Sequence, residues 1–185
     1  MNENYWKNYY KTHKTNEPSD FAKFCFDFLD KDDIVMDIGA GNCRDTNLFR
    51  LKCITLSVDP NFESGDRHHL QKKVKDVEFL KNSIIYSRWW LHSVTEDEEN
   101  DFLAKIAKSN STLMAEFRVV GDKTDNTHER RLINPEKFIL KLISLGFRIG
   151  YYQVGYGFSK VGKDDPLLAR IIATHKNYGK NKSNK

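Results

Sequence analysis

Short apolar runs alternate with stretches of helical periodicity along most of the chain. The runs predict strands at residues 34–38, 54–59, 74–77, 83–86, 111–118, 147–155 and 167–175. Helical periodicity separates most of them, at residues 19–29, 42–52, 95–109 and 134–145. This alternation predicts an α/β fold with a doubly wound, Rossmann-like, seven-stranded sheet. No helix separates the last two strands, so we expect the last strand to insert as an antiparallel partner.

Capping signals and apolar stripes define the predicted helices. Residues that favour capping stand at three helix starts: Ser19, Thr95 with Glu98, and Asn134 before Pro135. The stripes predict core-facing side chains at Phe21, Phe24, Cys25, Phe28 and Leu29, at Leu48 and Leu51, and at Phe138, Ile139, Leu142, Ile143 and Leu145. Gly146 then ends the last helix.

The stretch 34–43 carries the strongest candidate chemistry. Its apolar run contains Asp37 and ends in Gly39 and Gly41, which is how a buried strand delivers its carboxyl end to a nucleotide-sized ligand. A dinucleotide fingerprint needs a third glycine where Arg44 stands, so hydride chemistry is the weaker interpretation. Asp59 follows Asp37 after 22 residues, the separation at which a second acid holds a ribose diol.

Together these residues resemble the first two motifs of the class I S-adenosylmethionine-dependent methyltransferases. The resemblance implies that S-adenosylmethionine is the cofactor. By position, Asp76 resembles the acid that bonds the adenine amino group, with Val77 against the ring, and an aspartate in a surface turn is the alternative for Asp76. An aromatic segment around Trp6 resembles a lid over the cofactor, and packing outside the sheet is the alternative. The cofactor residues implied are Asp37, Gly39, Ala40, Gly41, Asp59, Pro60, Asp76, Val77, Ser87 and Trp6.

The stretch 83–93 resembles the fourth motif of the same superfamily, in which residues after a strand line the cofactor and the acceptor. Ser87, Arg88 and His92 therefore sit at the expected carboxyl end of a strand. Arg88 either binds an anionic acceptor or forms an ion pair with the acidic residues 96–99. The polar segment 121–131 follows a central strand, where acceptor recognition is commonly built, although a solvated loop is the alternative.

A narrower resemblance is to small methyltransferases of polysaccharide and nucleotide-sugar biosynthesis. The segments that carry it are 86–88, 91–93, 116–118, 128–131, 165–166 and 170–172. It implies methylation of a sugar hydroxyl on a small, anionic substrate. Such a reaction needs a base, for which His128 is the first choice and His92 and Asp122 are rivals. We expect the acceptor anion to be bound by arginines, with candidates Arg88, Arg118, Arg130 and Arg131.

Composition narrows these functions further. The chain has 185 residues and a formal charge of +4, and four lysines lie in residues 176–185. The remaining body is neutral, which argues against nucleic acid as the substrate. We expect one methyltransferase domain at 1–175, with lid and cap helices in 1–30 and a disordered basic tail at 176–185. No membrane-spanning run or signal-peptide core is visible, so a cytoplasmic location is expected.

Alternatives to these assignments remain open at the level of sequence. Cys25, Cys43 and Cys53 have no zinc-binding spacing and are odd in number, so neither a metal site nor a disulfide framework is expected. Metal assistance through Asp122 and Asp125 is an alternative to catalysis without a metal. The rival functions are an RNA methyltransferase and a non-catalytic, cofactor-binding partner subunit.

Overall fold

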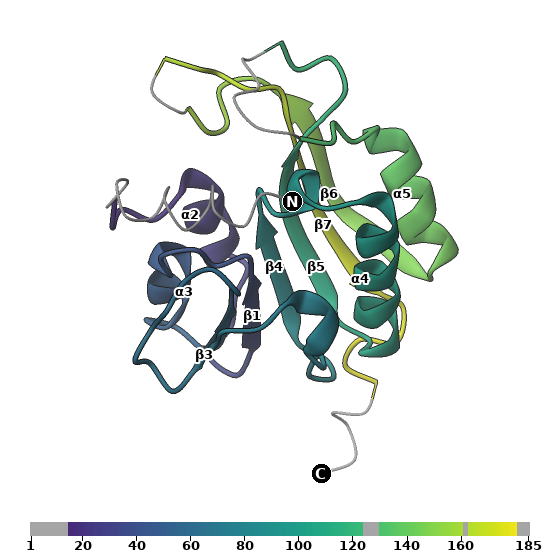
Figure 1. Cartoon of the computed structure of the whole chain (residues 1–185). Coiled ribbons are helices and arrows are strands. Elements are labelled where there is room, and N and C mark those ends of the chain that lie inside the picture. The colour runs from purple at the N-terminus through teal and green to yellow at the C-terminus, as the bar shows by residue number, and fades with distance from the viewer. Residues whose placement is uncertain (1–14, 124–129, 161–162, 181–185) are drawn as a thin grey trace.

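A computed structural model describes residues 15–123, 130–160 and 163–180 of the chain (Figure 1). Its strands are β1 Ile34–Ile38, β2 Ile54–Val58, β3 His69–Leu70, β4 Ile84–Arg88, β5 Thr112–Arg118, β6 Phe147–Gly155 and β7 Leu168–His175. Its helices are α2 Asp20–Phe26, α3 Arg44–Phe49, α4 Glu96–Lys108 and α5 Pro135–Ser144, with short 3₁₀ helices η1 Val74–Asp76 and η2 Leu91–Ser93.

The seven strands form one sheet in the order β3-β2-β1-β4-β5-β7-β6. The strands from β3 to β5 pair in parallel, and β7 pairs antiparallel with both β5 and β6. The predicted doubly wound sheet with an antiparallel last strand is therefore confirmed. The chain order reverses between β1 and β4, so their carboxyl ends form the edge where open α/β sheets bind ligands.

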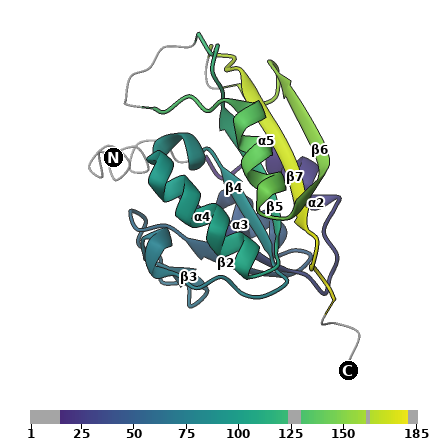
Figure 2. The ribbon, with the colours of Figure 1, turned by 90° about the vertical axis from the view of Figure 1, so that its right-hand side faces the viewer.

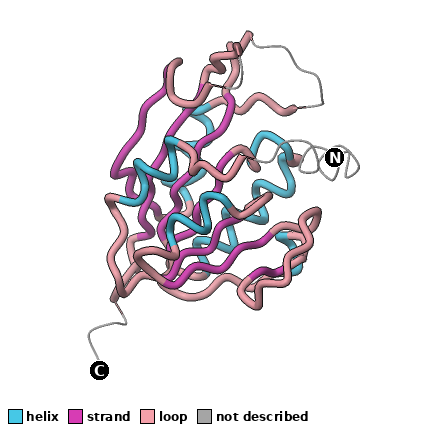
Figure 3. Tube along the Cα trace, turned by 90° about the vertical axis from the view of Figure 1, so that its left-hand side faces the viewer, coloured by secondary structure: helices cyan, strands magenta, loops and turns pink. Residues whose placement is uncertain are grey.

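Helices cover both faces of the sheet, as Figures 2 and 3 show from opposite sides. Alternation along each strand sends successive side chains to opposite faces. In β4, Ile85 belongs to the core cluster under α4 and α5, whereas Ile84 and Tyr86 pack with α2 and α3. Helix α2 therefore lies on the same face of the sheet as α3, the helix that follows the two glycines. Within the described residues, every helix is too short or too polar to cross a membrane.

The predicted helix starts are confirmed at all three caps. The Ser19 hydroxyl accepts a hydrogen bond from the Ala22 N–H, and Thr95 forms a full capping box with Glu98. Asn134 accepts from the Lys137 N–H ahead of the turn that Pro135 begins. These contacts satisfy backbone donors that a helix cannot pair internally, which is why the local sequence predicts them.

Several element predictions were wrong. Residues 74–77 were expected as a strand but form the 3₁₀ helix η1, and the third strand is His69–Leu70. The second helix is shorter than residues 42–52, which leaves Leu51 80% exposed because it lies beyond the helix. Phe28 and Ile143 also face solvent. The first five residues of the expected tail, 176–180, form a turn in which the Gly179 N–H donates to Asn82 Oδ1, and the rest of that tail lies outside the described residues.

Candidate functional site

The turn after β1 brings the backbone close to its neighbours. Gly39 has a φ of 73°, and a Cβ at this position would lie 2.8 Å from the Cβ of Trp90. Only glycine fits such an approach without displacing the indole. The Gly39 N–H donates to the Val58 carbonyl at 2.9 Å, which fixes the turn against β2. Cys43 ends the turn with a φ of 61°, a left-handed conformation that the sequence pattern did not reveal.

Asp59 closes this loop from the end of β2. Its Oδ2 accepts the Gly41 N–H at 2.9 Å and its Oδ1 accepts the Asn61 N–H at 2.8 Å. Burial raises the pKa of this carboxyl, and the two backbone hydrogen bonds oppose that rise. Asp59 therefore lies directly beside the glycine loop, and its role toward a ribose stays a prediction. Pro60, which follows, is partly exposed at the same edge.

Asp37 lies deeper, in β1, and is only 2% exposed. Thr46 of α3 donates its hydroxyl to Asp37 Oδ2 at 2.6 Å. Burial, and secondly the nearby carboxylate of Asp45, raise the pKa of Asp37 to about 8. Asp45 is itself buried and accepts hydrogen bonds from the Ser19 N–H, the Ser19 hydroxyl and the Tyr86 hydroxyl. The cap of α2 is therefore tied directly to the helix that follows the glycine loop.

The other predicted cofactor residues occupy different depths at this edge. Ser87 is fully buried at the end of β4, opposite Ile38 in the register, and its hydroxyl has no hydrogen-bond partner among the described residues. Val77 is buried after η1, whereas Asp76 is exposed on it. Ala40 is partly exposed in the glycine loop. Trp6 lies outside the described residues.

Glu116 organises the neighbouring part of the edge. It is 0% exposed in β5, and its carboxylate accepts four side-chain donors: Arg88 Nε at 3.1 Å, Trp89 Nε1 at 3.1 Å, Ser159 Oγ at 2.9 Å and Arg170 Nε at 2.7 Å. Arg88 pairs with Glu116, so its expected alternative pairing with residues 96–99 was wrong. Sequence reasoning missed Trp89, Ser159 and the central role of Glu116, because these residues meet only through the β4, β5 and β7 register.

Arg118 follows on the same strand and is 2% exposed. Its Nη1 donates to Asp122 Oδ2 at 2.8 Å, and its backbone N–H donates to Nδ1 of the buried His92 at 3.2 Å. Asp122 also accepts the Leu167 N–H. The guanidinium of Arg118 lies 5.6 Å from the Trp89 ring centroid. Arg88 and Arg118 are thus brought together around one indole, but Arg118, His92 and Asp122 are buried in contacts with one another.

Arg131 does not join this group. Its guanidinium forms an ion pair with the buried Glu99 of α4, and its Nε donates to the Val94 carbonyl. Arg130 beside it is partly buried. His128 and Asp125 lie outside the described residues.

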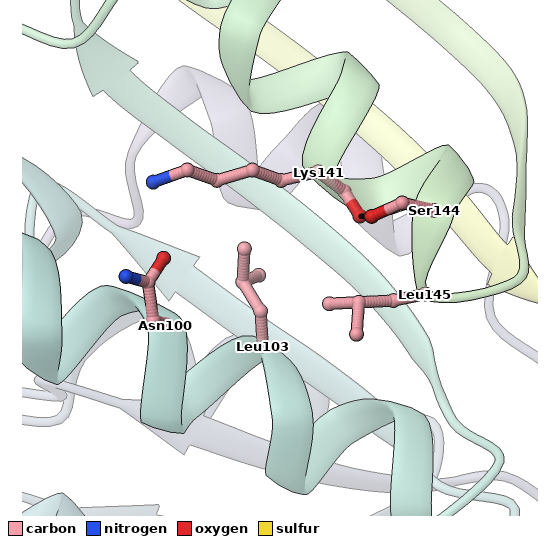
Figure 4. A pocket seen from close by; sticks show the side chains of 5 residues that line it. All are labelled: Asn100, Leu103, Lys141, Ser144 and Leu145. Atoms are coloured by element: carbon pink, nitrogen blue, oxygen red, sulfur yellow. Dashed lines mark hydrogen bonds between the residues drawn. The ribbon is translucent and has the colours of Figure 1, made fainter.

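A separate groove of about 190 Å³ lies between α4 and α5 (Figure 4). It is lined by Asn100, Leu103, Lys141, Ser144 and Leu145. The Lys141 ammonium pairs with Glu96 at 2.6 Å and with Glu99 at 2.8 Å. None of the predicted cofactor or acceptor residues lines this groove. Across the described ranges, no three His, Cys, Asp or Glu side chains are grouped closely enough to hold a metal ion.

Comparison with known proteins identifies the fold. No protein-family model matches the sequence, and a search of curated proteins gives no significant match. Solved structures do match: one is a S-adenosylmethionine-dependent methyltransferase from Methanosarcina mazei, with a TM-score of 0.66, 14% identity, and coverage of 82% of this chain and 96% of that chain.

Two other neighbours extend the comparison. The 1,6-didemethyltoxoflavin-N1-methyltransferase of Burkholderia thailandensis, solved with S-adenosylhomocysteine, has a TM-score of 0.64 and 15% identity, and the match covers 84% of this chain and 76% of that one. The cyclase SpnF has a TM-score of 0.64 and 12% identity, with 83% and 79% covered. The chain therefore has the class I methyltransferase fold, and at these identities the likeness establishes the fold alone.

Proposed function

We propose that this protein is an S-adenosylmethionine-dependent methyltransferase that methylates a sugar hydroxyl, in a nucleotide sugar or a glycan precursor. The observation that supports it most strongly is the loop after β1, in which Asp59 accepts the Gly41 N–H beside the left-handed Gly39. This is a narrow turn with a buried carboxylate at the edge where the sheet order reverses, the expected position for a nucleoside ligand.

The residues at this edge fit that cofactor. Asp59 is placed to hold the ribose hydroxyls, with Pro60 beside it, and Asp76 and Val77 are assigned to the adenine. Gly39, Ala40 and Gly41 line the chain of atoms that leads to the sulfonium, and Trp6 is assigned to the lid. The unpaired Ser87 hydroxyl and the buried Asp37 give this side a polar lining without a cationic partner among the described residues. When bound, the cofactor supplies a methyl group that its positive sulfur already activates.

The protein then needs to align the acceptor and remove one proton. The acceptor oxygen forms a bond to the methyl carbon as the carbon–sulfur bond breaks, and the hydroxyl proton passes to the base. His128 is our first choice for this base. His92 and Asp122 are less suitable, because His92 is 1% exposed and accepts the Arg118 N–H while Asp122 pairs with the Arg118 guanidinium.

The acceptor class is proposed from this chain's own residues. The fold neighbours carry names that refer to different acceptors, and one is a cyclase, so the fold by itself does not select a substrate. The support for a sugar or nucleotide sugar is the order of short motifs along the chain and the arginines beside the glycine loop. An anionic group on the acceptor is consistent with those arginines.

The test is to follow the methyl group. The protein is incubated with methyl-labelled S-adenosylmethionine and separate pools of nucleotide sugars, free sugars and RNA. Label in the nucleotide-sugar or sugar pool is the expected result. Label found only in ribonuclease-sensitive material would replace the sugar acceptor with RNA, and cofactor binding without transfer to any pool would favour a partner subunit that is not itself catalytic.

Substitution at position 128 tests the base. We expect His128→Ala to reduce turnover at least 100-fold, since general-base catalysis contributes about 10²–10⁴-fold, while cofactor affinity measured by calorimetry stays within about twofold. The exposed His68→Ala provides the matched control and should retain activity. Full activity in His128→Ala would assign the proton transfer to another group.

A further inference from the structure

Arg88 differs from Arg118 and Arg131 in how its guanidinium is used. Its Nε donates to Glu116 at 3.1 Å, and its guanidinium carbon lies 4.2 Å from the Trp89 ring centroid. The side chain is 13% exposed, and its two terminal nitrogens have no hydrogen-bond partner among the described residues. The planar fork that arginine offers to an oxyanion is therefore held in place and left open.

The partner that holds Arg88 is itself fixed. Glu116 is completely buried and also bound by Ser159 and Arg170. Arg170 is further anchored through its Nη2, which donates to the Phe158 carbonyl at 2.8 Å. A guanidinium with a locked Nε and a stacked face loses little freedom when a ligand arrives, which favours binding.

Trp89 supports the same arrangement, and its backbone is strained. Its backbone has a φ of 61°, unusual for a large side chain, and such strain is typically concentrated at functional sites. The conformation is held by its N–H, which donates to the Glu116 carbonyl at 2.9 Å, and by its indole N–H, which donates to the Glu116 carboxylate. The strained turn presents the indole face to Arg88.

Ion pairing distinguishes Arg88 from the arginines Arg118 and Arg131. Arg118 is neutralised by Asp122, and Arg131 by Glu99. Arg88 and Arg170 share the single carboxylate of Glu116, which leaves one surplus positive charge in this group. The group adjoins the glycine loop, because Ser87 is opposite Ile38 in the register, Arg88 is the next residue of β4, and Gly39 is the first residue after β1.

We propose that Arg88, positioned by Glu116 and Trp89, binds a carboxylate or phosphate of the acceptor through its two terminal nitrogens. This inference rests on the proposed methyltransferase function and narrows its substrate to a sugar that carries an oxyanion near the methylated hydroxyl. Glu116, Trp89, Ser159 and Arg170 act as positioning residues. Arg118 and Arg131 belong to internal ion pairs instead.

The test measures anion binding apart from methyl transfer. Glucuronate, glucose 1-phosphate and glucose are titrated into the full-length protein with S-adenosylhomocysteine present and absent, and binding is followed by calorimetry and tryptophan fluorescence. We expect at least one of the two anions to bind and neutral glucose to bind at least tenfold more weakly. The two anions distinguish a carboxylate from a phosphate as the natural group.

Arg88→Lys is the informative variant, because it retains a positive charge beside Glu116 but removes the fork. We expect it to weaken anion binding at least tenfold, while Arg148→Lys, an exposed position on β6, stays within twofold. Trp89→Leu is a second variant, expected to weaken anion binding several-fold through loss of the stacking surface. Circular dichroism confirms that each variant is folded before it is titrated.

The outcomes separate this inference from the proposed function. Anion affinity that is the same in wild type and Arg88→Lys, or equal binding of glucose and its anionic relatives, would overturn the inference. If neutral sugars are then methylated, the proposed function stands without it. If labelled S-adenosylmethionine does not bind at all, the proposed function fails, whereas loss of anion binding in Arg88→Lys would still establish the Arg88 site.

Discussion

Buried carboxylates lie on both sides of the β1–β4 boundary, and the two sides stabilise them differently. On the side of the glycine loop, Asp37 and Asp59 accept hydrogen bonds from a hydroxyl and from backbone N–H groups, with no ion pair among the described residues. On the other side, Glu116 and Asp122 are paired with arginines, and Glu99 with Arg131 and Lys141.

The difference indicates what each side is suited to bind. Burial raises the pKa of both Asp37 and Asp59, as expected where no cation compensates for lost hydration. A ligand that carries its own positive charge, such as a sulfonium, would supply the missing partner. Around Glu116 the positive charge is already in excess, which suits an anion. The proposed cofactor and acceptor thus have opposite charges that match the two sides.

Removing Glu116 should have the largest effect on stability. Glu116→Ala leaves the Arg88 and Arg170 guanidiniums without their shared carboxylate in a buried setting, so we expect a loss of about 3–5 kcal/mol in the free energy of unfolding. Urea denaturation followed by circular dichroism measures this loss. The effect would show that the arginine side depends on ion pairing.

The control for Glu116→Ala is Glu78→Ala. Glu78 is exposed and lies outside any helix or strand, so its removal should change the free energy of unfolding by less than about 0.5 kcal/mol. A loss below about 1 kcal/mol for Glu116→Ala would mean that the two arginines find water or other partners, and the contrast between the two sides would then disappear.

Asp37 tests the opposite side through pH. Its folded-state pKa is about 8, well above the value of about 3.9 expected in the unfolded chain, so the folded state binds the extra proton between these values. The favourable contribution of this group is complete below about pH 4 and is lost as the pH rises through about 8. In Asp37→Asn this dependence is absent.

We therefore expect Asp37→Asn to match wild type in stability at or below about pH 4 and to exceed it by about 4–5 kcal/mol near pH 8, because one proton corresponds to about 1.4 kcal/mol per pH unit. Urea denaturation at a series of pH values measures the difference. The exposed Asp101→Asn should follow the wild-type curve at every pH. A constant difference between Asp37→Asn and wild type across this range would show that Asp37 stays ionised in the fold.

Features set by residues close together in the sequence could be predicted, whereas features set by contacts between distant residues could not. Helix caps such as Ser19 and Asn134, and the glycine turn after β1, are set by residues close in sequence and were confirmed. The expected strand at 74–77 was wrong, since β-branched residues also fit a short 3₁₀ turn whose buried Val74 anchors it.

The candidate site shows the same dependence. The position of Asp59 at the end of the second strand could be predicted, because one helical crossover fixes its separation from Asp37 along the chain. The role of Glu116 could not be found in this way, because it lies 28 residues from Arg88 and 54 from Arg170, and only the pairing of β5 with β4 and β7 brings them together. Arg118 was expected to bind the acceptor, but its charge is neutralised by Asp122, four residues further along the chain.

Tyr86 provides the smallest and most local test of the contrast. Its hydroxyl donates to Asp45 Oδ2 at 2.8 Å on the glycine-loop side, where the other Asp45 oxygen lies 3.9 Å from Arg44 Nε. In Tyr86→Phe, Asp45 keeps both donors from Ser19, so we expect a loss of about 1 kcal/mol, the value of one hydrogen bond. Tyr151→Phe, whose exposed hydroxyl bonds Gln153, is the matched control and should lose less than about 0.5 kcal/mol. Equal losses in the two variants would mean that Asp45 does not depend on Tyr86, whereas a loss near that of Glu116→Ala would mean that the single neutral donor Tyr86 stabilises Asp45 as strongly as the arginines stabilise Glu116.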